Sequence, residues 1–334
     1  MSDTDFLLES RGDAQDLGAW VIGLAFGRDG GCAFALGDGT VRLADGWRTV
    51  AAHDGACLSI CADAKDGVLT GGDDGRLMHI APDGTATEVA KYGSKWVDQV
   101  AAHESGLRAA AVGKAVHILD GKGAALKSLA HPSTVTGIAF DAKGKRIAAS
   151  HYNGASLWFV GAKESSPRLL EWKGSHIGVT ISPDGTHVVT TMQENTLHGW
   201  RLADGQHMRM AGYPSKTKSM AFTAKGRWLA TAGADCVVLW PFFGGGPMGK
   251  APTELAGGDG VICTTVACHP TQEVVAAGFD DGLVLIAEVT SGRVVPVAAP
   301  RGSAVSALAW NGVGSHLAFG TEGGFAGLID LSKR

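Results

Sequence analysis

The sequence predicts an all-β protein, a single β-propeller of eight four-stranded blades, and three observations lead to this expectation. An apolar run followed by a Gly/Asp turn recurs eight times along the 334 residues. Successive copies lie about forty residues apart, a period typical of repeated supersecondary units. No window of ten or more residues keeps the period of an amphipathic helix. A four-stranded unit cannot bury a core alone, so radial stacking of the units is the expected solution.

Within each unit the strands are short apolar runs bounded by turn residues, as strands usually are. The unit around Phe222 shows the pattern most fully, with runs at 219–222, 227–233, 236–240 and 253–256. Turns such as SPDG at 182–185 and DDG at 280–282 combine residues that favour tight turns, since Gly accepts positive φ. The eight copies of the repeated phrase lie at 24–30, 60–67, 100–106, 138–144, 180–185, 220–226, 266–270 and 308–314.

The two chain ends complement each other. The last unit has only three strand candidates, 307–310, 315–320 and 325–330, and one spare candidate, 5–10, precedes the first unit. The N-terminal strand is therefore expected to complete the last blade and close the ring, which makes residues 1–334 one domain. The alternative is seven blades, which would follow if the weak unit 95–132 is not a true blade.

The ends of the third strands resemble those of WD-repeat propellers, although no copy has a literal Trp-Asp pair. They read SLWF (156–159), LHGW (197–200) and VVLW (237–240), and His53, His131 and His176 stand at the preceding loops. The resemblance implies a hydrogen-bond network of loop His, strand-two Ser/Thr, turn Asp/Asn and strand-three Trp within a blade. It also implies a scaffold that presents loops to other proteins. The sets implied are His131, Ser150, Asn153 and Trp158; His176, Thr190 and Trp200; and Thr231, Asp235 and Trp240 without a His.

Charge and cysteine content narrow the function classes. The formal net charge is −4, which disfavours a nucleic-acid surface; the basic cluster Lys216, Lys218, Lys225 and Arg227 is the only feature that favours one. Six cysteines without a CxxC pair are expected to be reduced and structural. The N-terminus lacks a basic, then apolar leader, and no apolar run reaches the ~18 residues of a membrane span. We therefore expect a cytoplasmic protein without membrane insertion.

Motifs for catalysis, cofactors or metals are incomplete. The stretch 244–251 approaches a phosphate-binding loop, but Ala251 stands where Ser or Thr must bind Mg²⁺. The pair His103-Glu104 begins a zinc motif, yet Leu107 occupies the second His position. We therefore expect no catalytic residue, no cofactor and no metal, and hence not an enzyme.

Two groups of residues are the candidates for partner binding. The first lies at the entry to the first strands and in one turn, where aromatic and charged side chains exceed what packing needs; the second lies in the long loop 241–252. Tucking of these aromatics against the blades is the alternative in both groups. The candidates are Trp20, Trp96, Asp98, Tyr152, Lys216 and Lys218 at the strand entries and turn, and Phe242, Phe243 and Met248 in the loop.

The function expected from these observations is a non-catalytic scaffold that presents propeller loops to a protein partner. The alternative is an enzyme or a binder of a small ligand or cofactor in the central channel. The segment Glu288–Gly292 faintly resembles a turn of quinoprotein propellers, but the positions that follow carry no Trp. The sequence does not name the partner.

Overall fold

The computed structural model describes residues 5–163, 166–257 and 260–332. The chain divides into two compact units, residues 1–24 with 212–334 (unit 1) and residues 25–211 (unit 2). Both units consist almost wholly of antiparallel strands. The expectation of a single domain stays a prediction.

The strands of unit 2 follow each other through tight turns, and all but β15 (Arg146–Phe159) and β16 (Arg168–Ile181) are short. One 3-10 turn, η1 (Asp45–Trp47), interrupts them. The strands are β3 (Cys32–Leu36), β4 (Thr40–Leu43), β5 (Arg48–Ala51), β6 (Cys57–Ala62), β7 (Val68–Gly72), β8 (Arg76–Ile80), β9 (Ala86–Lys91), β10 (Gln99–Ala102), β11 (Arg108–Val112), β12 (Ala115–Leu119), β13 (Ala125–Ala130), β14 (Gly137–Phe140), β15 (Arg146–Phe159), β16 (Arg168–Ile181), β17 (His187–Met192), β18 (Leu197–Arg201) and β19 (His207–Met210).

Unit 1 is likewise built of short strands and adds a short helix, α1 (Leu7–Arg11). Strand β2 (Val21–Phe26) begins in unit 1 and ends in unit 2. The other strands are β1 (Gly12–Asp16), β20 (Met220–Phe222), β21 (Trp228–Thr231), β22 (Cys236–Pro241), β23 (Thr253–Gly257), β24 (Cys263–Cys268), β25 (Val274–Phe279), β26 (Val284–Glu288), β27 (Val294–Ala298), β28 (Val305–Trp310), β29 (His316–Thr321) and β30 (Phe325–Asp330).

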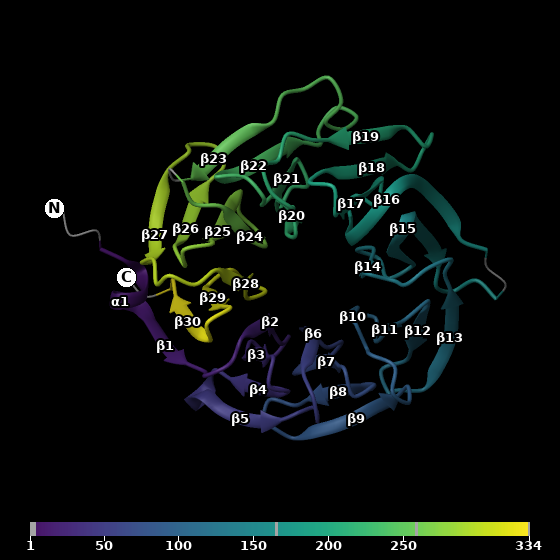
Figure 1. Ribbon diagram of the computed structural model, residues 1–334, viewed down its shortest axis with the longest axis horizontal. Coiled ribbons are helices and arrows are strands. Elements are labelled where there is room, and N and C mark those ends of the chain that lie inside the picture. Colours follow the sequence, from purple (N-terminus) through teal and green to yellow (C-terminus); the bar gives the residue numbers. More distant parts are fainter. Residues whose placement is uncertain (1–4, 164–165, 258–259, 333–334) are drawn as a thin grey trace. The chain divides into compact units, whose positions relative to one another are not determined.

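Over the described residues the strands form seven sheets, six of four strands and one of six. The four-stranded sheets are antiparallel and mostly run in chain order, as in β6-β7-β8-β9 (Figure 1). Such repeated meanders are the blades of a β-propeller, so the expected fold class is confirmed. The count of seven corresponds to the alternative and not to eight separate sheets, although the unit 95–132, expected to be the missing blade, forms the regular sheet β10-β11-β12-β13.

The six-stranded sheet accounts for this correction. It runs β14-β15-β16-β17-β18-β19, and both β15 and β16 are 14 residues long. The first half of β15 pairs with β14 and its second half with β16, with a register shift between Tyr152 and Gly154. Because pairing continues through these long strands, two stretches with separate copies of the repeat join into one sheet.

The N-terminus completes the sheet of the last three strands, as expected, but with different residues. Strand β1 pairs antiparallel with β30, Gly12 opposite Ile329 and Asp16 opposite Phe325 (Figure 1). The expected strand 5–10 is wrong in position, since residues 7–11 form α1. Leu8 is buried with Phe319 and Ile329 in one cluster, so these apolar residues pack as a helix instead of pairing as a strand.

The core lies between neighbouring sheets. In unit 2, Ala109 and Ala111 of one sheet pack with Ile147 and Trp158 of the next. The middle strands carry small residues with no exposed surface, such as Ala109, Ala110 and Ala111, which lets sheets approach closely. Within the described residues no helix has the length and apolar character that crossing a membrane requires.

Candidate functional site

The expected network of the fourth repeat is formed in part. Trp158 donates its indole N–H to Nε2 of His131 at 3.1 Å, and both side chains are buried. Ser150 instead contacts the hydroxyl of Thr136 at 3.1 Å, and Asn153 accepts a hydrogen bond from the Gly174 amide. Burial lowers the pKa of His131 to about 4, with nearby His151 adding to the effect. This imidazole is a neutral structural group.

Two further histidines are held in the same manner. His53 contacts Asp74 at 3.0 Å through Nδ1 and Thr70 at 2.9 Å through Nε2. His176 contacts Thr190 at 2.7 Å, but the buried indole N–H of Trp200 finds no acceptor among the described residues. Burial lowers the pKa of both His53 and His176. These side chains stabilise the blades and leave no free general base at these positions.

In the sixth repeat a tyrosine takes the place of the missing histidine. Trp240 donates its indole N–H to the hydroxyl of Tyr213 at 2.6 Å, and that hydroxyl lies 2.6 Å from Thr231. The separation of 27 residues between Tyr213 and Trp240 equals that between His131 and Trp158. This equal spacing is the signal by which the sequence could have identified Tyr213.

The candidate residues for partner binding differ in exposure. Four of them expose half or more of their surface: Trp20 50%, Trp96 57%, Tyr152 56% and Met248 50%. Lys218 is exposed, and Asp98 and Lys216 are partly so. Burial raises the pKa of Asp98. The candidates divide between the units: Trp96, Asp98 and Tyr152 belong to unit 2, and the others belong to unit 1.

Phe242 requires a correction, because its side chain is buried. It packs edge-on against Phe222 with ring centroids 5.0 Å apart, which leaves 7% of its surface exposed. The loop 241–252 therefore starts by anchoring an aromatic ring in the blade. Phe242 offers no contact surface to a partner in this structure.

Phe243, the next residue, stays partly exposed and is held by cations. Its ring packs edge-on against Trp228, with Arg227 5.1 Å and the Lys250 ammonium 4.7 Å from its centroid. Lys250 also donates hydrogen bonds to the carbonyls of Phe243 and Gly246. The ammonium thus fixes the loop from inside, and Met248 remains at its exposed outer side.

Tyr152 stands at a pocket of about 350 Å³ in unit 2. Its amide donates to the Ser133 hydroxyl at 2.9 Å, and its carbonyl accepts from Nδ1 of His151 at 3.0 Å. Because a carbonyl oxygen can only accept, Nδ1 of His151 donates to it, and Nε2 lies 2.8 Å from the Ser156 hydroxyl. Tyr152 thus lies within β15 and not in a turn as expected, and these hydrogen bonds hold its backbone beneath an exposed aromatic ring. The lining residues are Pro132, Ser133, His151, Tyr152, Asn153, Ala155, Leu169, Leu170 and Glu171.

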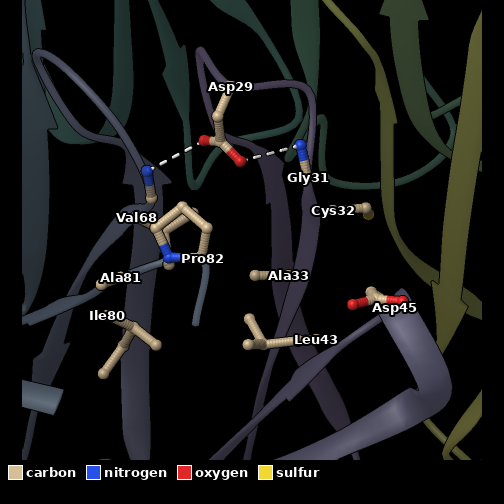
Figure 2. A pocket seen from close by; sticks show the side chains of 11 residues that line it. Asp29, Gly31, Cys32, Ala33, Leu43, Asp45, Val68, Ile80, Ala81 and Pro82 are labelled. Carbon is tan, nitrogen blue, oxygen red and sulfur yellow. Dashed lines mark hydrogen bonds between the residues drawn. The ribbon is translucent and has the colours of Figure 1, made fainter. Parts of the chain in front are cut away.

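A second pocket of unit 2, about 280 Å³, has an apolar floor that includes Leu43, Val68 and Pro82 (Figure 2). The Asp29 carboxylate accepts backbone hydrogen bonds from Gly67 at 3.0 Å and Gly31 at 3.2 Å (Figure 2). Burial raises the pKa of the Cys32 thiol in its wall, so the thiol stays protonated. Asp29 joins two turns, and we interpret this pocket as a structural joint.

Comparisons with known proteins agree with this fold. No family model matches the chain. The chain is 24% identical over 295 residues to Autophagy-related protein 16 of Arabidopsis thaliana, covering 82% of this chain and 55% of that protein. It is 26% identical over 188 residues to Telomerase protein component 1 of Mus musculus, covering 54% of this chain and 7% of that protein. Both are WD-repeat-type proteins, and the chain spans about half the length of the first and a small part of the second.

Among solved structures, the crystal structure of the computationally designed Ika8 protein is similar with a TM-score of 0.75. The likeness covers 94% of this chain and 96% of that chain at 17% identity. At this identity the match shows the fold alone.

Proposed function

We propose that this chain is a WD-repeat scaffold that binds a protein partner through the exposed aromatic side chains of unit 2. The observation that carries the proposal is the geometry of Tyr152. Its ring is more than half exposed at the edge of a pocket, while its backbone is fixed by Ser133 and His151. A large aromatic side chain on a hydrogen-bonded strand loses little conformational entropy on binding, which is typical of interface anchors.

The chemistry of the titratable groups supports a non-enzymatic role. The histidines of the blades make structural hydrogen bonds, and burial lowers the pKa of His131, His176 and His198. Burial raises the pKa of the thiols, to about 12 for Cys57 and Cys61, so they are poor nucleophiles at neutral pH. Burial thus favours the neutral imidazole and the protonated thiol, and in these forms the side chains stabilise the sheets. The cysteines are free, which supports a reducing compartment such as the cytoplasm as the place of action.

The test is affinity purification of the tagged full chain from its native cells with quantitative mass spectrometry. Trp96→Ala and Tyr152→Ala are compared with Val313→Ala. The Val313 side chain is exposed, and its position in the sequence is far from every candidate residue. We expect the same protein to be lost with both aromatic variants and kept with the control. That protein must then bind the purified chain directly. Unchanged recovery with both aromatic variants contradicts the proposed site.

The eightfold repeat is also part of the proposal: we infer that the six-stranded sheet is two four-stranded blades, in which the two halves of β15 and the two halves of β16 each count as separate strands. Ala148, Ala155 and Leu157 of β15 pack in one cluster with Val188 and Trp200 of β17 and β18. Strands of a single flat sheet do not pack face to face, so the sheet must fold over within β16. The register shift in β16, between His176 and Gly178, is where a bend is expected. An experimental structure with a continuous, unbent sheet at this shift would contradict the inference.

A further inference from the structure

We infer that an apolar groove in unit 2, apart from the Tyr152 pocket, docks an acidic segment of a protein partner through a large apolar side chain. The inference rests on the proposed scaffold function and specifies the chemistry of a partner. The groove measures about 580 Å³. It is lined by Leu107, Leu126, Gly144, Lys145, Phe159, Val160, Gly161 and Ala162.

The groove exposes apolar surface that nothing in the described part of the chain covers. Leu126 on β13 is 51% exposed and Phe159 at the end of β15 is 58% exposed. Exposed large side chains are common singly, but two that share one concave lining with Leu107 and Val160 are not scattered. Burying such side chains contributes about 25 cal/mol per Å² of apolar area removed from water. The groove therefore favours a partner that inserts a large apolar side chain.

The walls of the groove are held in place by hydrogen bonds across two loops. The Lys127 ammonium of β13 donates to the carbonyl of Ala162 in the loop after β15. The amide of Val160 donates to the carbonyl of Lys145 at 2.9 Å. A wall fixed before binding reduces the entropy lost when a partner docks.

The one charged side chain in the lining of the groove is positive, and this charge favours an acidic partner. Lys145 is the one charged residue of the lining, and Lys143 and Lys163 are exposed within two residues of lining positions. The carboxylate of the same turn, Asp141, is buried and accepts hydrogen bonds from Arg146 and from the Lys145 amide. An acidic segment thus finds the Lys145 ammonium in the lining, in a chain whose overall charge is −4.

The chemistry of the lining favours a protein segment over other anionic partners. A nucleic acid would place phosphates and flat bases here, whereas the lining offers aliphatic side chains, one phenyl ring and no arginine. A segment with Leu or Phe between acidic residues matches both the apolar lining and its single lysine. The partner is therefore defined by this pattern and not by its fold.

The test selects displayed random dodecapeptides on the full chain and measures binding of the enriched peptides by fluorescence anisotropy. We expect enrichment of acidic peptides with at least one large apolar residue. Phe159→Asp and Lys145→Glu should each weaken their binding at least ~10-fold. Val313→Asp and Lys225→Glu are the controls, since they introduce a carboxylate at an exposed apolar position and an exposed lysine of unit 1. Melting curves verify that every variant is folded.

Three results overturn the inference. In the first, the enriched peptides lack acidic residues. In the second, Phe159→Asp and Lys145→Glu leave peptide binding unchanged. In the third, phosphatidylserine vesicles bind through these residues while no peptide does. Peptides that still bind Phe159→Asp but are lost with Tyr152→Ala would place recognition at the Tyr152 pocket. The scaffold function would then stand, and the docking groove would be rejected.

Discussion

The hydroxyl of Tyr213 accepts the indole N–H of Trp240 in the position where His131 accepts that of Trp158. The two donor–acceptor pairs have the same separation of 27 residues, and all four side chains are buried. Tyr213 also lies 2.6 Å from the Thr231 hydroxyl, so it links two strands of its sheet. In these two repeats one acceptor thus stands at the same place, and two residue types provide it.

Tyr213→Phe should destabilise the chain by about 1–3 kcal/mol, because it leaves the buried indole N–H of Trp240 without an acceptor. Tyr213→His should recover part of this loss, because imidazole can accept at the same position. Chemical denaturation of both variants measures the effect. Tyr152→Phe is the matched control, since that hydroxyl belongs to an exposed side chain. Equal stability of Tyr213→Phe and the wild type would show that the bond is not stabilising.

The sequence predicted the repeat well and its exceptions poorly, for physical reasons. Periodic apolar runs and Gly turns are local signals; at 282, for example, φ is 96° and a Cβ would lie 3.0 Å from two backbone atoms. The continuity of β15 through Tyr152 depends on pairing with β16, which no local signal encodes. Leu8 likewise forms a helix because of its distant contacts with Phe319 and Ile329.

For the candidate site the outcome depends on side-chain direction. Phe242 and Phe243 are neighbours in sequence, yet one points into the blade and the other lies under Lys250. Composition placed both in a loop, but only packing against Phe222 decides which ring is buried. The groove around Phe159 was missed because its lining comes from three separate turns and from strands β13 and β15.

His131 should make the stability depend on pH. Burial lowers its pKa to about 4 in the folded chain, against about 6.5 when unfolded. As the pH falls, the unfolded chain therefore binds this proton before the folded chain does. The stability that neutral His131 contributes is thus fully present above pH 6.5 and is lost between pH 6.5 and 4. Between pH 7 and 4, the free energy of unfolding of His131→Gln should fall by about 2–3 kcal/mol less than that of the wild type. Urea denaturation at both pH values measures this, with the partly exposed His103→Gln as control. Equal losses of stability in the wild type, His131→Gln and His103→Gln would argue against this role of His131.

Arg108 should be required because it neutralises a fully buried carboxylate. Its guanidinium donates from Nε to Asp63 at 2.9 Å and from a second nitrogen to the other oxygen. Arg108→Met leaves that carboxylate buried and without this cation, which should cost about 3–5 kcal/mol. Adding Asp63→Asn should recover much of the loss, and a double-mutant cycle measures the coupling. Asp204→Asn, in the exposed pair with Arg201, should change stability by less than about 1 kcal/mol. A similar small effect at Arg108 would mean that water reaches Asp63.

Lys250 should control the order of the loop 241–252 without controlling the fold. Its ammonium donates to the carbonyls of Phe243 and Gly246 and lies 4.7 Å from the centre of the Phe243 ring. Lys250→Met keeps the apolar stem and removes these bonds, so the loop should open more often while the buried Phe242 still anchors its start. Limited chymotrypsin digestion should cut after Phe243 or Met248 about 5–10 times faster, with the melting temperature nearly unchanged. Lys225→Met is the control for charge removal on the same unit. If cleavage is no faster, the edge-on packing of Phe243 on Trp228 holds the loop, and the ammonium adds little.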